Sequence, residues 1–87
     1  MSKIRFTITT KPGELLVGET ITLTKEPTNQ FDDEAIKVST GSVSGYVGAY
    51  YKTLKPGTYS AGRLLDKIPF TTKAVVVADR VGEVEVA

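Results

Sequence analysis

The sequence predicts a small, mostly β protein: an antiparallel barrel of five to six strands with one short helix. Three observations favour this fold class. Apolar and polar residues alternate along most of the chain, turn-forming residues separate the alternating runs, and one short segment has helical spacing. At 87 residues the chain is long enough for one domain, residues 1–87, with a modest core.

The first half of the chain contains the more regular alternation. Its predicted strands are residues 3–9, 19–26, 35–39 and 42–48, and its predicted turns are residues 11–14 and 40–42. Successive side chains of a strand point to opposite faces. The first strand therefore turns Phe6 toward the core with its two isoleucines. The fourth strand turns Val47 inward and Tyr46 outward.

The second half begins with a loop and ends with two strands. Residues 49–58 form the loop, because Pro56 and Gly57 interrupt regular structure. Residues 60–68 are predicted to be a helix that begins at Ser60 as N-cap and stops before Pro69. The final strands are predicted at 73–79, where a run of β-branched residues suggests burial on both faces, and at 82–87.

Absent residue types narrow the function. Without histidine or cysteine, the chain lacks the side chains that serve most often as general bases, as nucleophiles and as zinc ligands. We therefore expect a protein that is not an enzyme and has no cofactor. The longest apolar run, residues 74–78, is too short to cross a membrane. The N-terminal residues lack the apolar segment of a secretion signal, so a cytoplasmic location is expected.

Basic and aromatic residues are concentrated in the middle of the chain. Residues 45–73 contain five lysines and arginines against one aspartate, whereas the whole chain has a net charge of +1. All four tyrosines lie in the same stretch. Basic charge among exposed rings is typical of surfaces that bind single-stranded nucleic acid. A solvated loop region is the alternative interpretation of these charges.

Three consecutive acidic residues, Asp32, Asp33 and Glu34, lie between the second and third predicted strands. They lack the alternating ligands and the glycine of an EF-hand loop. Too few residues follow them before Ser39 for a helix that they could cap. Loose binding of Mg²⁺ and a solvated turn stay open, and no specific metal site is predicted. A turn is favoured because the side chains of Asn29 and Asp32 can each accept a backbone hydrogen bond two residues on.

The segment around these acids resembles the signature of a known family. Residues 26–38, EPTNQFDDEAIKV, are similar to the HIRAN domain signature, in which Glu-Pro is followed by Asn-x-aromatic-Asp and then by Ala-Ile-x-Val. Gly-Tyr-Val at 45–47 resembles the second signature of the family, and residues 60–68 resemble the short helix of its compact bacterial members. The resemblance spans roughly residues 4–80.

The resemblance implies a small β-barrel related to the oligonucleotide-binding fold, and capture of single-stranded DNA at a free 3′ end. Phe31 would stack on the terminal base, and Asp32 would accept a hydrogen bond from the 3′-hydroxyl. Tyr46 would reach sugar or phosphate. Asn29 and Lys52 complete the expected DNA-binding residues. The implied partners are single-stranded DNA ends and a helicase or nuclease that acts in DNA repair or replication.

Each expected role has an alternative. Phe31 could instead plug one end of the barrel, Tyr46 could be half-buried packing, and Lys52 could be a solvated surface charge. DNA-capturing members of the family have a second aromatic stacking face on the first strand. Here the only ring of that strand, Phe6, points inward. The alternative function is therefore a non-catalytic protein-interaction or regulatory module that has lost DNA binding.

Overall fold

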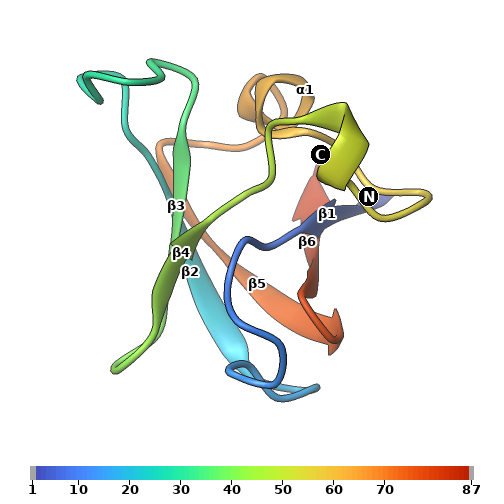
Figure 1. Cartoon of the computed structure of the whole chain (residues 1–87). Coiled ribbons are helices and arrows are strands. Elements are labelled where there is room, and N and C mark those ends of the chain that lie inside the picture. The colour runs from blue at the N-terminus through green and yellow to red at the C-terminus, as the bar shows by residue number, and fades with distance from the viewer. Residues whose placement is uncertain (1, 87) are drawn as a thin grey trace.

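A computed structural model describes residues 2–86 and contains six strands, one α-helix and one 3₁₀ helix (Figure 1). The elements in chain order are β1 (Ser2–Thr7), β2 (Thr20–Lys25), β3 (Ile36–Ser39), β4 (Ser44–Tyr46), η1 (Tyr51–Thr53), α1 (Ala61–Leu65), β5 (Thr71–Ala78) and β6 (Val81–Val86). The prediction of a mostly β fold with one short helix is confirmed.

The six strands form one antiparallel sheet in the order β1-β6-β5-β2-β3-β4. The sheet is strongly curved, so that β4 passes in front of β2 and β3 in Figure 1 while β1 and β6 lie on the other side of the molecule. Beyond the ends of the two edge strands, Ile8 and Val47 form an isolated antiparallel bridge. One bridge is not a continuous ladder, so the sheet is not closed and "barrel" describes it only loosely.

The inner face of the curved sheet carries the core. Phe6 of β1 is fully buried, as the alternation of its strand predicts. Its ring lies against Gly82 of β6, where the Cβ of any larger residue would overlap ring atoms. The other fully buried large side chains come from or adjoin the strands and α1: Ile8, Ile21, Leu23, Ile36, Val38, Leu64, Val76 and Val84.

Two details of the predicted elements are wrong. β5 is not buried on both faces: Ala74 and Val76 are buried, but Val75 between them is 42% exposed. The core lies on only one side of this single curved sheet, so the outer face of β5 meets solvent. The predicted helix 60–68 is shortened to Ala61–Leu65. Ser60 does cap it, accepting a hydrogen bond from the Arg63 backbone, whereas the residues after Leu65 form a turn.

Candidate functional site

The acidic segment between β2 and β3 is a hydrogen-bonded turn. The Asn29 side-chain oxygen accepts hydrogen bonds from the backbone N–H groups of Phe31, at 2.8 Å, and Asp32, at 3.1 Å. Asp32 Oδ1 in turn accepts from the backbone N–H of Glu34 at 2.9 Å. The prediction that Asn29 and Asp32 fasten this turn is therefore confirmed. The turn fixes the direction in which the residues between them point.

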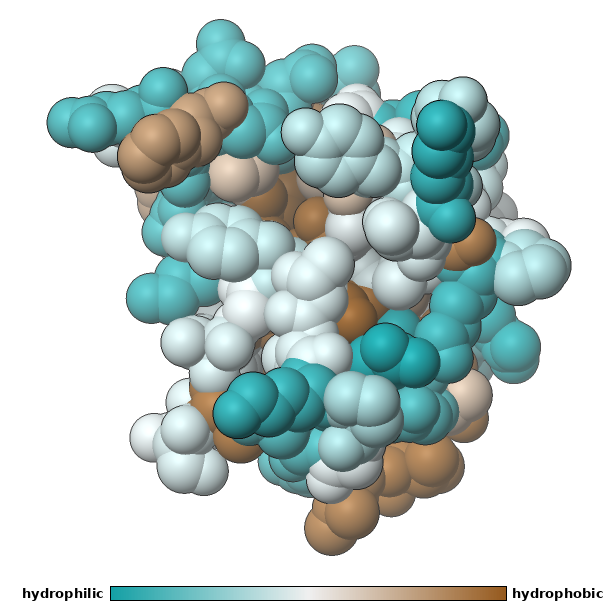
Figure 2. Space-filling view, in the orientation of Figure 1, coloured by the Kyte–Doolittle hydropathy of each residue, from teal (hydrophilic) through white to brown (hydrophobic). Residues whose placement is uncertain are grey.

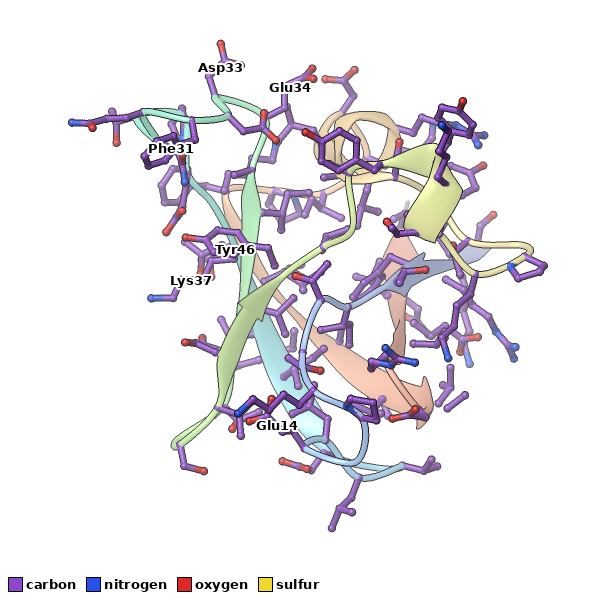
Figure 3. All side chains as sticks on the ribbon, in the orientation of Figure 1. Glu14, Phe31, Asp33, Glu34, Lys37 and Tyr46 are labelled. Carbon is purple, nitrogen blue, oxygen red and sulfur yellow. The ribbon has the colours of Figure 1, made fainter. Side chains whose placement is uncertain are left out.

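This turn presents Phe31 to solvent. The Phe31 side chain is 96% exposed, so the interpretation that it plugs one end of the sheet is wrong. Asp32 is half-buried beside it, whereas Asp33 and Glu34 are exposed and project away from Phe31 and Tyr46 (Figure 3). Within residues 2–86, no group of three acidic side chains lies close enough together to hold a metal ion. A large exposed ring next to a half-buried carboxylate is the main feature of the turn.

A groove of about 340 Å³ lies against the turn. Its lining residues are Thr9, Asn29, Phe31, Asp32, Ala35, Tyr46, Val47, Ala49 and Tyr50. Figure 2 shows it as a hollow between the protruding hydrophobic side chain of Phe31, at the upper left, and paler side chains beside it. Four of the residues expected to bind DNA therefore meet in one groove: Asn29, Phe31, Asp32 and Tyr46. A volume of this size is within the range of about 300–1,000 Å³ that is typical of small-ligand sites.

Tyr46 is held in place by a carboxylate that we did not predict as part of the site. Glu26, just after β2, accepts hydrogen bonds from the Tyr46 hydroxyl at 2.9 Å and from the Asn29 side-chain amide at 3.1 Å. These two bonds tie the turn to β4 and orient both walls of the groove. Glu26 belongs to the Glu-Pro pair of the family signature, but no role was predicted for it. Its position at the end of a strand, three residues before the turn-forming asparagine, was the available signal.

The same bonds shift two pKa values. The hydrogen bonds from Asn29 and then Tyr46 lower the pKa of Glu26 below the usual glutamate value. The bond to Glu26 raises the pKa of Tyr46 above the usual tyrosine value. Because the single hydroxyl proton of Tyr46 is donated to Glu26, this hydroxyl cannot also donate to a phosphate while the bond is intact. Tyr46 is 39% exposed and lines the groove, so its ring is available to a ligand.

Tyr50 is a further aromatic residue of the groove. It lies in the segment between β4 and η1, where its backbone is extended and its side chain is largely exposed. The groove thus has three rings, from Phe31, Tyr46 and Tyr50. Strand alternation could not identify Tyr50, because it belongs to no strand. The missing first-strand aromatic therefore does not leave Phe31 as the only ring near the groove.

Two other residues complete the description of the site. Thr9 joins the sheet edges: its hydroxyl and backbone N–H both donate to the Tyr46 carbonyl, at 2.9 and 2.8 Å. Thr9 also lines the groove. Lys52 is different. It lies in η1, is exposed, and is not among the lining residues, so its expected contact with DNA stays a prediction.

We expect the hydrogen bonds of Glu26 to depend on pH at both extremes. The lowered pKa of Glu26 means that its stabilising contribution is present above its unfolded value, about 4.3, and is lost as the pH falls through the folded value. The raised pKa of Tyr46 has the opposite sign. Its contribution is present below about pH 10 and is lost as the pH rises through the folded value.

NMR titration of the Glu26 carboxyl carbon and the Tyr46 ring carbon measures both effects. In Glu26→Gln, which removes the charged acceptor, Tyr46 should titrate closer to an ordinary tyrosine. A wild-type Glu26 carboxyl whose pKa is not below the usual glutamate value would contradict the arrangement.

Comparison with family models, with curated proteins and with solved structures found no match. Among residues 2–86 there is also no helix with the length and apolar character needed to span a membrane.

Proposed function

We propose that the protein binds single-stranded DNA at a free 3′ end and catalyses no reaction. The observation that carries the proposal is the common groove of Phe31, Asp32 and Tyr46, three residues to which the HIRAN resemblance assigns contacts with the DNA terminus. That resemblance selects DNA as the ligand, and the groove supplies a place for its last nucleotide. A helicase or nuclease in DNA repair or replication is the class of partner that such a module would serve.

The rings supply affinity that does not depend on sequence. A base stacked on an aromatic side chain gains about 1–3 kcal/mol, and every base has a face that can stack. Phe31 is well suited to this role because almost all of its surface is free. Tyr46 and Tyr50 line the same groove and offer further contact surface to the base and sugar. Accordingly, we assign Tyr46 a contact through its ring rather than through its hydroxyl, whose proton is held by Glu26.

Asp32 supplies selectivity for the end of the strand. A carboxylate repels the phosphates along a continuous strand but accepts a hydrogen bond from a terminal hydroxyl. Oδ1 of Asp32 already accepts one hydrogen bond from the Glu34 backbone, which fixes the carboxylate. An ionised carboxylate has about four lone-pair sites, so it retains acceptor capacity. A strand is therefore best accommodated where it ends in a free 3′-hydroxyl.

The decisive experiment compares the two kinds of end. Binding of a ten-residue oligothymidylate with a 3′-hydroxyl is measured against the same strand with a 3′-phosphate. We expect the wild-type protein to prefer the hydroxyl by about tenfold or more, equivalent to about 1.4 kcal/mol. Asp32→Asn should lose most of this preference, because the repulsion of the terminal phosphate disappears. Asp33→Asn is the matched control, since it removes the same charge from a neighbouring side chain outside the groove.

Equal affinity for both ends, with a steep salt dependence, would indicate only general attraction to phosphates and would overturn the proposal. Absence of binding at low salt would favour the second candidate, a protein-interaction module. The observation that favours this alternative is the pair of exposed apolar residues Leu16 and Val17, 67% and 69% exposed, in the loop between β1 and β2. This loop lies at the bottom of Figure 1, at the far end of β2 from the groove.

A further inference from the structure

A second pocket adjoins the groove across Thr9. It has a volume of about 280 Å³ and is lined by Thr7, Ile8, Thr9, Thr10, Thr53, Lys55 and Arg80. Thr9 lines both this pocket and the groove. The two have different chemistry. The groove has three aromatic rings and a carboxylate, whereas the lining of the second pocket has four threonines, a lysine and an arginine.

Two buried polar atoms of this pocket lack hydrogen-bond partners. Within residues 2–86, the buried side-chain nitrogen and oxygen atoms without a hydrogen-bond partner are Thr10 Oγ1 and Arg80 Nε. Of the two, Arg80 Nε does have an ion-pair partner, Asp79 Oδ2, at 3.5 Å. Both residues line the second pocket. Unpaired buried polar atoms are rare in folded proteins, and a bound ligand is one of the features that account for them. Arg80 Nε can only donate a hydrogen bond and the Thr10 hydroxyl can donate or accept one, so an acceptor ligand suits both atoms.

The charges of the pocket favour an anion. Lys55 Nζ donates one hydrogen bond to the Asp79 backbone carbonyl at 2.8 Å, and an ammonium group has two more donors. Arg80 Nε lies 3.5 Å from Oδ2 of Asp79, while Oδ1 of that carboxylate accepts from the Gly13 backbone. Asp79 therefore offsets one of the two cations and one positive charge remains. A guanidinium group has five donors, enough to contact both Asp79 and a ligand.

Arg80 has a backbone conformation that is unusual for a residue other than glycine. Arg80 is the residue after Asp79 in the turn between β5 and β6, and its φ is +56°, a conformation that glycine adopts most readily. Glycine would adopt this backbone conformation with less steric strain. Arginine at this position therefore places a guanidinium group at the pocket at some conformational cost. Because glycine tolerates this conformation, the substitution Arg80→Gly removes the side chain without straining the turn.

We infer that the second pocket binds a backbone phosphodiester of the same DNA strand whose 3′ end enters the groove. This inference rests on the proposed function and adds the direction in which the bound DNA strand runs. The terminal hydroxyl lies at Asp32 and the terminal base against Phe31. The strand then runs toward its 5′ side across Thr9, and a phosphate near the 3′ end reaches Thr10, Lys55 and Arg80.

The test pairs protein variants with a chemically altered strand. The probe is a ten-residue oligothymidylate with a free 3′-hydroxyl, in which a single linkage is an uncharged methylphosphonate, placed first, second or sixth from the 3′ end. Arg80→Gly removes the guanidinium and suits the backbone, so the melting temperature should stay equal or rise. Lys55→Gln is a second variant of the pocket. Lys67→Gln is the matched control, because it removes an equal charge beside a different surface groove.

For wild type, we expect a methylphosphonate at the first or second linkage to weaken binding by about 5- to 20-fold, and one at the sixth linkage to have little effect. Arg80→Gly and Lys55→Gln should weaken binding of the unmodified strand by a similar factor and should respond little to the methylphosphonate. The Arg80→Gly variant should also show a smaller salt slope, by about 0.7, as expected for one fewer phosphate contact.

The results distinguish a failure of the phosphate pocket from a failure of the proposed 3′-end groove. If wild type distinguishes the 3′-hydroxyl from the 3′-phosphate but both pocket variants bind like Lys67→Gln, the phosphate pocket is overturned and the groove stands. If the variants and the methylphosphonates weaken binding independently rather than substituting for one another, the phosphate is bound elsewhere. If wild type binds no single strand at low salt, the proposed function fails and the phosphate pocket fails with it.

Discussion

Replacement of Phe31 by alanine should weaken binding of a 3′-hydroxyl DNA strand by about 5- to 150-fold and leave thermal unfolding unchanged. The range corresponds to the loss of about 1–3 kcal/mol from one stacked base. Stability should be unaffected because the ring is almost fully exposed and contributes little to the core. Fluorescence anisotropy of a labelled oligothymidylate gives the affinity, and calorimetry gives the melting temperature.

Phe70→Ala is the matched control for this variant. Phe70 is also an exposed phenylalanine, but it lies just before β5 and does not line the groove. The Phe70→Ala variant should bind DNA as the wild type does. If Phe31→Ala and Phe70→Ala had the same affinity, then Phe31 would not be a stacking platform, and the assignment of the groove would lose its main source of affinity.

Replacement of Phe6 by alanine should have the opposite result, a large loss of stability. Removing a fully buried phenylalanine typically costs about 3–5 kcal/mol, and a chain of 87 residues has roughly 4–13 kcal/mol in total. The ring also packs against Gly82, so its loss opens a cavity between β1 and β6. Urea denaturation measures the effect. We expect the free energy of unfolding to fall by about 3–5 kcal/mol.

Phe6→Leu is the conservative comparison, because it keeps an apolar side chain in the cavity and should cost less than the alanine variant. The fraction of Phe6→Ala that remains folded should bind DNA with nearly wild-type affinity, since Phe6 does not line the groove. An unfolding free energy within about 1 kcal/mol of wild type would contradict the description of the core.

The contrast between these phenylalanines indicates what the sequence can predict. Alternation along a strand fixes on which face each side chain lies, so the inward direction of Phe6 and the outward direction of Tyr46 were both predicted correctly. Alternation does not say how many faces of a sheet are covered. The apolar run around Val75 therefore suggested burial on both faces, whereas the single curved sheet leaves one face in solvent.

The candidate site was partly predictable for a similar reason. The hydrogen bonds of Asn29 and Asp32 are local, within a few residues, so the turn could be recognised from its residue types. Glu26 and Tyr50 join the site through contacts between segments distant in sequence. Such contacts depend on the path of the chain after β4, which has no periodic pattern. The absence of Lys52 from the groove lining depends on the same path.

The most direct test of the central claim is an NMR titration that follows every backbone amide as an oligothymidylate with a free 3′-hydroxyl is added. We expect the largest chemical-shift changes in residues 29–35 and 45–50 and at Thr9, the segments that line the groove. Unchanged amides in these segments, with the largest changes around Lys3, Arg5 and Lys67, which line a separate surface groove, would contradict binding in the groove of Phe31 and Asp32.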